Sequence, residues 1–316
     1  MVNLIRRAGV VVVGAVVLAC SAPGLGVAEP VAEPPAPSTS YHTLPADFSL
    51  AVTPTRVVVG PSEIDSAHRV QVINRGRDPL DVVVQKRNFV GGTDGSLVFR
   101  PGAPWAASSW VTVSPASFRL APGTAQSVTA HIAKPADAEP GDHQVALVFL
   151  VPADPAGAEN VKINRAIAAP MYITVPGPTD DSARLGGLAA PGFVTDGPVE
   201  LTATVRNTGT VHHDFRGHAR LAVDAAGSPA SFPDFTVPRG GTRVVRTMWE
   251  PPLLCICHPS VSVTKADGSV ETVRTQVIVF PWYLFVVLLL VVVLLVVLDI
   301  RRRRRRRSRV EARADA

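Results

Sequence analysis

Residue types that bind metals or carry redox chemistry gather in the second half of the chain. They are His212, Asp214, Cys255, Cys257 and His258. On an extended strand His212 and Asp214 share a face, so a metal site requires the Cys-x-Cys-His segment to fold against them. In the alternative interpretation, the histidines lie in a loop and the cysteines pack as small apolar residues or form a disulfide. The sequence favours that alternative, and it predicts no metal and no cofactor.

The two cysteines of the Cys-x-Cys segment stand two positions apart. An extended strand would place Cys255 and Cys257 on one face, with their Cα atoms near or beyond the limit for a disulfide. Bridging them therefore requires a turn, which Pro251, Pro252 and Pro259 make possible.

Catalytic motifs do not occur in the chain. The sequence contains neither a Gly-x-Ser-x-Gly elbow nor a His-Glu-x-x-His helix, which are the settings of an activated nucleophile and of a zinc protease. We therefore predict a protein that is not an enzyme, with no catalytic residues. An enzyme that depends on a metal or thiol in the second domain remains the alternative from a different class.

Tryptophans are the other candidates for ligand contact. Trp105 stands in a loop with Gly102 and Pro104, and we predict it as an exposed, ligand-binding aromatic residue. Trp110 and Trp249 adjoin apolar runs, which is typical of tryptophans in the core of a β-sandwich.

The N-terminus reads as an export signal. Arg6 and Arg7 precede a small and apolar run over residues 8–19, which is the length of a signal-peptide core and too short to span a bilayer. Small residues favour cleavage after Ala28, which makes residues 1–28 the signal peptide. A competing lipobox at residues 17–20 would instead make Cys20 the lipidated first residue of the mature protein. Both alternatives predict export.

The C-terminus reads as a membrane anchor. Residues 281–300 are apolar enough to cross a bilayer as a helix; Pro281 suits its first turn, and Trp282 and Tyr283 suit the outer headgroup region. A basic tail, residues 301–316, follows. Its unbroken run comprises Arg301, Arg302, Arg303, Arg304, Arg305, Arg306 and Arg307. The positive-inside rule predicts a single-pass cell-membrane protein with its N-terminal domains outside and its C-terminus in the cytoplasm.

The charge of the chain resides mainly in this tail. The sequence has 31 basic and 26 acidic residues. Without the signal, the predicted membrane span and the tail, 20 basic and 23 acidic residues remain, so residues 29–280 carry a net charge of −3. This part offers no basic surface for nucleic acid. The predicted contact of the tail is the lipid bilayer.

The residues between the two ends predict an all-β fold. Residues 29–46 are rich in Pro and Ala and read as a linker. Short runs of Val, Ile, Thr and Phe, bounded by Pro, Gly and Asn, then predict a first immunoglobulin-like β-sandwich over residues 47–177. These runs are 48–59, 69–74, 80–89, 97–100, 110–113, 127–133, 144–151 and 165–175. Asp94-Gly95 predicts a hairpin turn between two of them.

A second sandwich is predicted over residues 186–280, after a linker at 178–185. Its runs are 199–206, 218–223, 242–249, 260–265 and 271–279. Two motifs of the first sandwich recur in it. Residues 72–76 (VINRG) match 205–209 (VRNTG), and residues 120–124 (LAPGT) match 237–242 (VPRGGT). The repeats favour two related domains, and we attribute the first motif to the tolerance of Asn and Gly for positive φ.

A family resemblance rests on several of these segments in order. In the first half they are residues 48–54, 110–115, 120–123, 138–141 and 166–177; in the second half they are 205–212, 249–252 and 280–282. Together with the C-terminal helix and its basic tail, they resemble the WxL-interacting protein family, in its actinobacterial membrane-anchored branch. The resemblance implies a first domain that binds peptidoglycan and a second that engages surface or host proteins.

Two non-catalytic functions follow. The favoured one is a cell-surface binding or scaffold protein that contacts peptidoglycan, other surface proteins, or both. The alternative is a membrane-tethered, chaperone-like assembly factor that uses β-strand addition, because a sheet edge can accept an extended segment of a partner.

Overall fold

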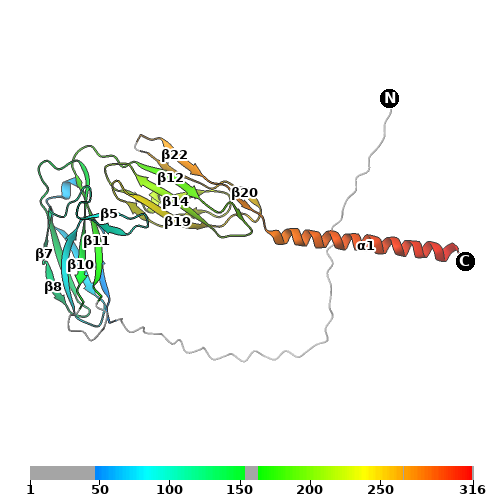
Figure 1. Ribbon diagram of the computed structural model, residues 1–316, viewed down its shortest axis with the longest axis horizontal. Helices are drawn as coiled ribbons and strands as arrows, with labels where there is room; N and C mark the ends of the chain where they lie inside the picture. The colour runs from blue at the N-terminus through cyan, green and yellow to red at the C-terminus, as the bar shows by residue number, and fades with distance from the viewer. Residues whose placement is uncertain (1–46, 154–162, 266, 315–316) are drawn as a thin grey trace, which may run out of the picture. The chain divides into compact units, whose positions relative to one another are not determined.

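The computed structural model describes residues 47–153, 163–265 and 267–314, with side chains described up to Arg302. The predicted signal peptide, Cys20 and the linker at 29–46 lie outside the described residues. So do the side chains of Arg303 to Arg307. The predicted fold class is confirmed: the chain forms two immunoglobulin-like β-sandwiches in tandem, followed by one long apolar helix (Figure 1).

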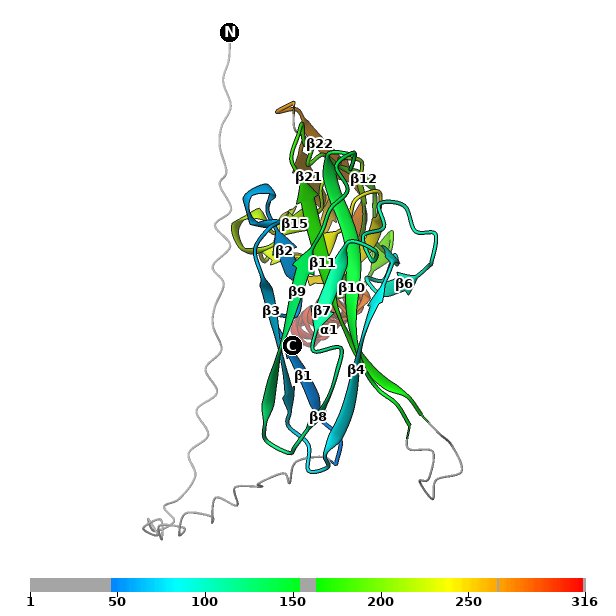
Figure 2. The same ribbon diagram turned by 90° about the vertical axis from the view of Figure 1, so that its left-hand side faces the viewer.

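Two facing sheets build the first sandwich (Figures 1 and 2). One sheet has the order β1-β3-β9-β7 and the other β2-β11-β10-β4-β8, and a separate hairpin, β5-β6, lies outside them. The elements are β1 (Leu50–Thr53), β2 (Val57–Val59), the 3-10 turn η1 (Pro61–Glu63), β3 (His68–Asn74), β4 (Leu80–Arg87), β5 (Phe89–Gly91), β6 (Leu97–Phe99), β7 (Val111–Ser114), β8 (Ser117–Leu120), β9 (Ala125–Ile132), β10 (Gly141–Val151) and β11 (Arg165–Val175).

The first predicted run, 48–59, divides between the two sheets. β1 pairs antiparallel with β3 in one sheet, whereas β2 pairs parallel with β11 in the other. The chain crosses between the sheets at Pro54, which has no N–H to donate to a ladder. The Asp94-Gly95 hairpin is confirmed, because β5 and β6 pair antiparallel and Gly95 has a φ of 89°.

Alternating side chains form the core of this sandwich. In β4, Leu80, Val82 and Val84 are buried, while Asp81 between them is exposed, as the two-residue period of a strand requires. β10 is buried on both faces, because one face joins the core and the other lies under β5. Trp110 is in the core, as predicted.

The second sandwich contains shorter strands. Its sheets have the orders β12-β14-β19, β13-β23-β20, β17-β16-β21-β22 and β15-β18. The elements are β12 (Ala183–Ala189), β13 (Phe193–Val194), β14 (Val199–Asn207), β15 (His213–Phe215), the 3-10 turn η2 (Gly217–Ala219), β16 (Ala222–Asp224), β17 (Ala230–Ser231), β18 (Phe235–Val237), β19 (Thr242–Trp249), β20 (Cys255–Cys257), β21 (Ser260–Thr264), β22 (Val270–Arg274) and β23 (Val277–Val279). Trp249 is fully buried in its core, as predicted.

The recurring Asn-x-Gly motif has the same structure in both sandwiches. The buried Asn74 amide donates to the carbonyls of Asp78 (2.7 Å) and Leu120 (3.1 Å), and its oxygen accepts the N–H of Gly76 (2.9 Å). Asn207 repeats this pattern with the carbonyls of Val211 (2.7 Å) and Val237 (3.0 Å) and the N–H of Gly209 (2.8 Å). The second repeated motif supplies one acceptor each time, which explains why the two motifs recur together.

Our explanation of the motif by positive φ was wrong. Neither asparagine nor the two motif glycines have positive φ. The glycines are required by space, since a Cβ on Gly76 would lie 2.5 Å from the carbonyl oxygen of Asp47, and one on Gly209 would lie 2.2 Å from that of Asp180.

The second sandwich also departs from the prediction in its boundaries. β12 begins at Ala183, inside the segment predicted as a linker, because residues 183–185 already pair with β14. The predicted run 218–223 instead holds the turn η2 and the start of β16. β15 begins at His213, which the loop interpretation places with His212 after the Asn-x-Gly turn, whereas His212 itself lies outside the strands.

One helix closes the chain, α1 (Trp282–Ala314), which includes the predicted span and continues into the basic tail. Its segment Trp282–Arg302 is long and apolar enough to cross a membrane, and none of it is buried in the protein. At 1.5 Å per residue, these 21 residues extend about 31 Å, the thickness of the hydrocarbon core.

Candidate functional site

The candidate metal ligands of the less favoured interpretation do not come together. Among the described residues there is no group of three His, Cys, Asp or Glu side chains that could hold a metal ion. His212 and Asp214 face the first sandwich, where they bind Asp142 and Arg56. Cys255 and Cys257 form a disulfide on β20, and His258 follows them, exposed.

The disulfide corrects our expectation about the cysteine pair. The two residues lie in a strand paired with β23, so no turn is needed. Their Cα atoms are 5.4 Å apart, which is within the usual range for a disulfide and shorter than the roughly 6.6 Å of two fully extended residues. A slight compression of the strand thus replaces the predicted turn.

Trp105 is not the freely exposed aromatic residue that we predicted. Its ring lies 4.5 Å from the guanidinium carbon of Arg239, and Gly240 packs against the ring so closely that a Cβ there would approach to 2.8 Å. Arg239 is 6% exposed and binds Glu139 at 2.5 Å. Trp105 therefore belongs to the contact between the two sandwiches.

A buried carboxylate lies at the centre of this contact. Asp142, the second residue of β10, accepts the backbone N–H of His212 (2.6 Å), the ring Nδ1 of His212 (2.5 Å) and the hydroxyl of Thr174 (2.7 Å). Burial alone would raise the pKa of Asp142, but the hydrogen bonds and charge of His212 outweigh it and hold this pKa below its usual range. The His212 ring also stacks on Tyr172 at 4.8 Å, and burial raises the pKa of Tyr172 to about 12.

An arginine makes the second polar contact. Arg56, directly before β2, binds both oxygens of Asp214 at 2.6 and 2.5 Å, and it donates to the hydroxyl of Thr236 at 2.8 Å. Asp214 and Thr236 are cross-strand partners in β15 and β18, so the pairing of these strands presents them together. Burial opposes the charge of Asp214, but Arg56 and Thr236 hold its pKa below the usual range.

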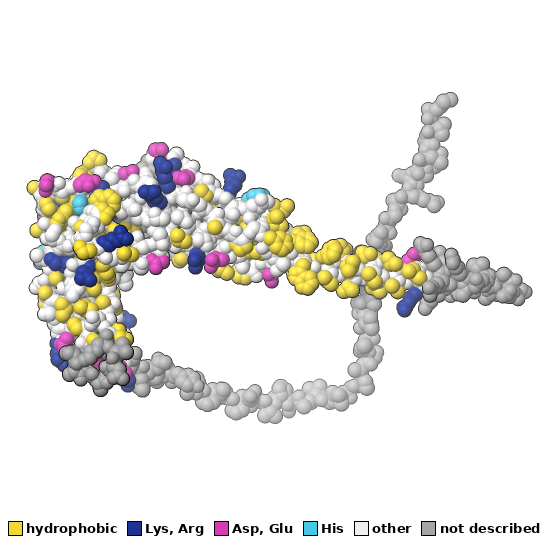
Figure 3. Space-filling view, viewed as in Figure 1, with side chains coloured by type: hydrophobic (Ala, Val, Ile, Leu, Met, Phe, Trp, Pro, Cys, Tyr) yellow, Lys and Arg dark blue, Asp and Glu magenta, His cyan; other side chains and the backbone are white. Residues whose placement is uncertain are grey.

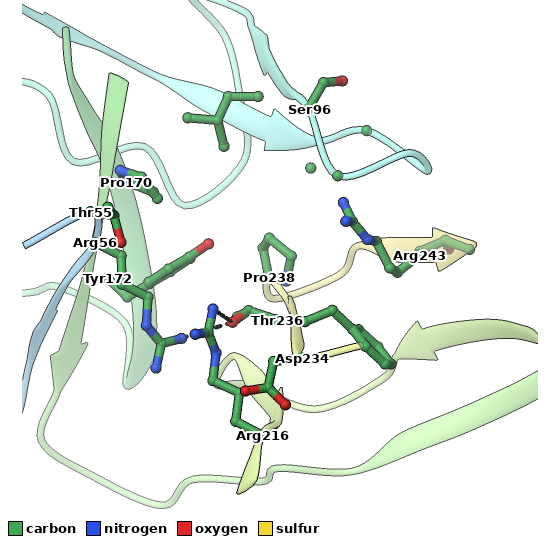
Figure 4. Close-up of a pocket in the computed structure, with 16 residues that line it drawn as sticks. Thr55, Arg56, Ser96, Pro170, Tyr172, Arg216, Asp234, Thr236, Pro238 and Arg243 are labelled. Carbon is green, nitrogen blue, oxygen red and sulfur yellow. Dashed lines mark hydrogen bonds between the residues drawn. The ribbon is translucent and has the colours of Figure 1, made fainter. Parts of the chain in front are cut away.

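A pocket of about 220 Å³ opens beside these contacts (Figure 4). Its labelled lining residues are Thr55, Arg56, Ser96, Pro170, Tyr172, Arg216, Asp234, Thr236, Pro238 and Arg243. Most of its charged side chains already form hydrogen bonds within the protein: Arg56 binds Asp214, Asp234 binds Arg220 at 2.8 Å, and Arg216 binds Thr236 at 3.4 Å. The pocket is therefore part of the contact between the sandwiches.

The Asp142–His212 pair does not form a nucleophilic triad. A triad requires a hydroxyl or thiol on the second ring nitrogen of the histidine. Here the nearby hydroxyl, that of Thr174, donates to the carboxylate instead. Nothing in the sequence singles out Asp142, Tyr172 or Arg56, because their partners in the second sandwich, His212 and Asp214, lie 40 or more positions away.

A free strand edge is the second candidate site. β11 pairs with β10 along its whole length, from Arg165 to Val175. On its other side only Met171, Tyr172 and Ile173 pair, with β2. Among the described residues, nothing pairs with 165–170 on that side. Figure 2 shows this end of the β10–β11 ribbon extending away from the body of the sandwich.

Comparisons with known proteins found similar solved structures but no relative by sequence. No family model and no curated protein match the chain. Among solved structures, it is similar to the E. coli chaperone DraB, with 15% identity over 72% of this chain and 98% of that one, at a TM-score of 0.38. It is also similar to the Pseudomonas aeruginosa CupB2 chaperone (15% identity, 71% and 98%, TM-score 0.35) and to a structure of the Salmonella enterica SafA pilin with the SafB chaperone (14% identity, 72% and 96%, TM-score 0.36). Likeness at this level concerns the fold alone.

Proposed function

We propose that this chain is a non-catalytic surface protein, anchored in the cell membrane by α1, that binds an extended segment of a partner protein by adding it as a strand along β11. The observation that carries the proposal is the half-paired β11: within the part of the chain that the structure describes, its residues 165–170 pair with a strand on one side only.

The open edge can bind a strand through its backbone. In an antiparallel pair, successive residues direct their N–H and C=O groups alternately toward and away from the partner strand. About half of the backbone polar groups of residues 165–170 therefore point away from β10. A partner segment would form on the order of five hydrogen bonds there, each contributing about 1 kcal/mol net.

The side chains of this edge favour the approach of another chain. Ala166, Ala168 and Pro170 are small, so a strand can lie close to the sheet. Ile167 is half-buried and packs against the core of the first sandwich, in the part of β11 that does not pair with β2. An apolar partner residue beside Ile167 would extend this core, which adds burial to the backbone bonds.

Other long or open edges of the described sheets are less suited. β1, β7 and β8 are edge strands of four residues each. β19 is longer, but it carries Arg243 and Arg246. Short or charged edges are the usual means by which proteins avoid unwanted strand pairing. β12 is an edge strand of seven residues, but a register shift between Leu185 and Gly187 interrupts its pairing with β14, and such bulges also protect an edge. β11 therefore offers the long, regularly paired edge with small and apolar residues.

An outward orientation of the sandwiches supports a surface role. The arginine run lies only on the C-terminal side of the apolar helix, which favours a cytoplasmic C-terminus. The disulfide of β20 is typical of an oxidising compartment outside the cytoplasm. Binding of peptidoglycan by the first sandwich, and the resemblance to WxL-interacting proteins, remain predictions.

A scaffold and an assembly factor would use the same edge. They differ in the lifetime of the complex: a scaffold keeps its partner, and a chaperone-like factor releases it. Pulse-chase labelling of the cross-linked partner described below distinguishes the two roles.

Paired substitutions at two sandwich edges test the proposal. Ile167→Lys places an inward-facing charge at the open edge, and Val113→Lys does the same in β7, where Val113 also packs half-buried against the same core. A photoreactive phenylalanine analogue at Ala166 reports the partner in living cells. We expect Ile167→Lys to abolish cross-linking and Val113→Lys to preserve it. Equal cross-linking in the two variants would refute strand addition at β11.

A further inference from the structure

A row of large apolar side chains lies exposed on the second sandwich just before the membrane helix. In the three-stranded sheet β13-β23-β20, Phe193 pairs with Ile278, and Ile278 pairs with Ile256. These three neighbours are 58%, 38% and 65% exposed, respectively. Their strand neighbours Val277, Val279 and Cys257 are buried in the core, so the sheet has an apolar face on each side.

The apolar surface continues beyond the row. Leu253 and Leu254 precede β20 and are 72% and 63% exposed, and Phe280 follows β23. Figure 3 shows hydrophobic side chains gathered where the second sandwich passes into the helix. We call these residues the juxtamembrane patch: Phe193, Leu253, Leu254, Ile256, Ile278 and Phe280.

The disulfide helps to orient the patch. Cys255 and Cys257 lie on the inner face of β20, where both contact the core of the second sandwich. Side chains alternate along a strand, so Ile256 between them points outward. The disulfide thus joins the two inward-facing residues of β20 and leaves Ile256 on the outer face of the sheet.

Chain connectivity keeps the patch close to the first residues of α1. Phe280 still donates its N–H to Val194 at 3.0 Å, and only Pro281 separates it from the first residue of α1. Ile278 is four residues from Trp282, so the two Cα atoms are within about 14 Å of each other. Trp282 and Tyr283 are residues that prefer the headgroup region of a bilayer. The patch therefore lies at the level of the outer leaflet when α1 is inserted.

We propose that the juxtamembrane patch rests in the outer leaflet of the membrane that α1 crosses, so that the second sandwich is seated on the lipid surface through the sheet β13-β23-β20. The three strands contain only Phe, Val, Cys and Ile, so seating them buries no charge from the sheet. Apolar faces at such a surface enter by about 5–10 Å. Exposed apolar patches of this kind are otherwise rare on soluble domains. This inference rests on membrane anchoring by α1.

Tryptophan quenching in the full chain tests the proposal. The chain is reconstituted at one copy per nanodisc, which excludes a second copy as the cover, in lipids with brominated acyl chains. In a Trp282→Phe background, Phe193→Trp reports the patch, and Ile278→Trp repeats the test if the first variant misfolds. Phe99→Trp on β6, where the native side chain is 41% exposed, is the matched control in the first sandwich.

We expect the indole introduced by Phe193→Trp to be quenched at least about twofold more strongly than that of Phe99→Trp, because it lies among the acyl chains. If both patch variants show only the quenching of the control while Trp282 of the otherwise unchanged chain is quenched, the patch does not touch lipid and the inference is overturned. If Trp282 is not quenched either, membrane anchoring itself fails.

Discussion

Replacing Asp142 with asparagine tests the contact between the two sandwiches most directly, because it changes one buried carboxylate and little else. The fully buried carboxylate receives two hydrogen bonds from His212 and one from Thr174. Asp142→Asn keeps the shape of the side chain but leaves only one acceptor oxygen and removes the negative charge. The Thr174 hydroxyl can rotate to accept from the new amide, but the bonds to His212 become neutral.

The expected loss follows from the number of weakened bonds. A hydrogen bond to a charged group contributes about 1.5–3 kcal/mol, against about 0.5–1.5 kcal/mol for a neutral one. Weakening two or three bonds by about 1 kcal/mol each predicts a loss of roughly 2–3 kcal/mol in the free energy of unfolding.

Urea unfolding of the detergent-solubilised chain, followed by tryptophan fluorescence, measures this loss. The matched control is Asp81→Asn, because Asp81 is exposed and its nearest approach to Arg119 is 3.6 Å. An exposed pair of this kind contributes less than about 1 kcal/mol. A midpoint shift for Asp142→Asn no larger than that of Asp81→Asn would refute our assignment of Asp142 as a central contact.

Four further predictions concern stability, pH, topology and binding. Asn74→Ala and Asn207→Ala each remove three hydrogen bonds from a buried site, and we expect each to lower the unfolding free energy by about 3 kcal/mol in urea titrations; a loss from only one of them would contradict the equivalence of the motifs. The pKa of Tyr172 is about 10 in the unfolded chain and about 12 in the folded one. Its ionisation therefore leaves the free energy of unfolding unchanged below pH 10 and lowers it by about 2.7 kcal/mol between pH 10 and pH 12. Tyr172→Phe should remove this loss, and an unchanged dependence of the unfolding free energy on pH in that window would contradict the prediction. A reporter fused after Phe280 should be active outside the cytoplasm and one fused after Ala316 inside, and the reverse pattern would contradict the orientation. A fragment with both sandwiches, residues 47–280, should sediment together with insoluble peptidoglycan even in moderate salt, because this region has little net charge. If the folded fragment stays in the supernatant, the prediction of peptidoglycan binding is wrong.

Local pattern was sufficient to predict most of the strands and the apolar C-terminal helix. The alternation of Leu80, Val82 and Val84 and the buried positions of Trp110 and Trp249 follow from two-residue periodicity and side-chain size. The helix from Trp282 follows from an unbroken apolar run. Both kinds of signal are contained in a few neighbouring residues.

The candidate sites could not be predicted in this way, because they depend on tertiary contacts. Trp105 looked exposed in its loop, but Arg239, more than 130 positions later, covers its ring. His212 and Asp214 were candidates for a metal site that the sequence did not favour, but their actual partners, Asp142 and Arg56, could not be inferred from it. The length of the free edge of β11 depends on where β2 begins, and the sequence of β11 does not indicate that position.

Hydrogen exchange along β11 tests the central claim most directly. The segment of the partner that cross-links to position 166 is synthesised as a peptide and added to the full chain in nanodiscs. We predict that the amides among residues 165–169 that point away from β10 gain protection on binding, while those of the edge strand β7 do not change. Protection that appears elsewhere, or no protection at residues 165–169 despite peptide binding, would contradict strand addition at β11.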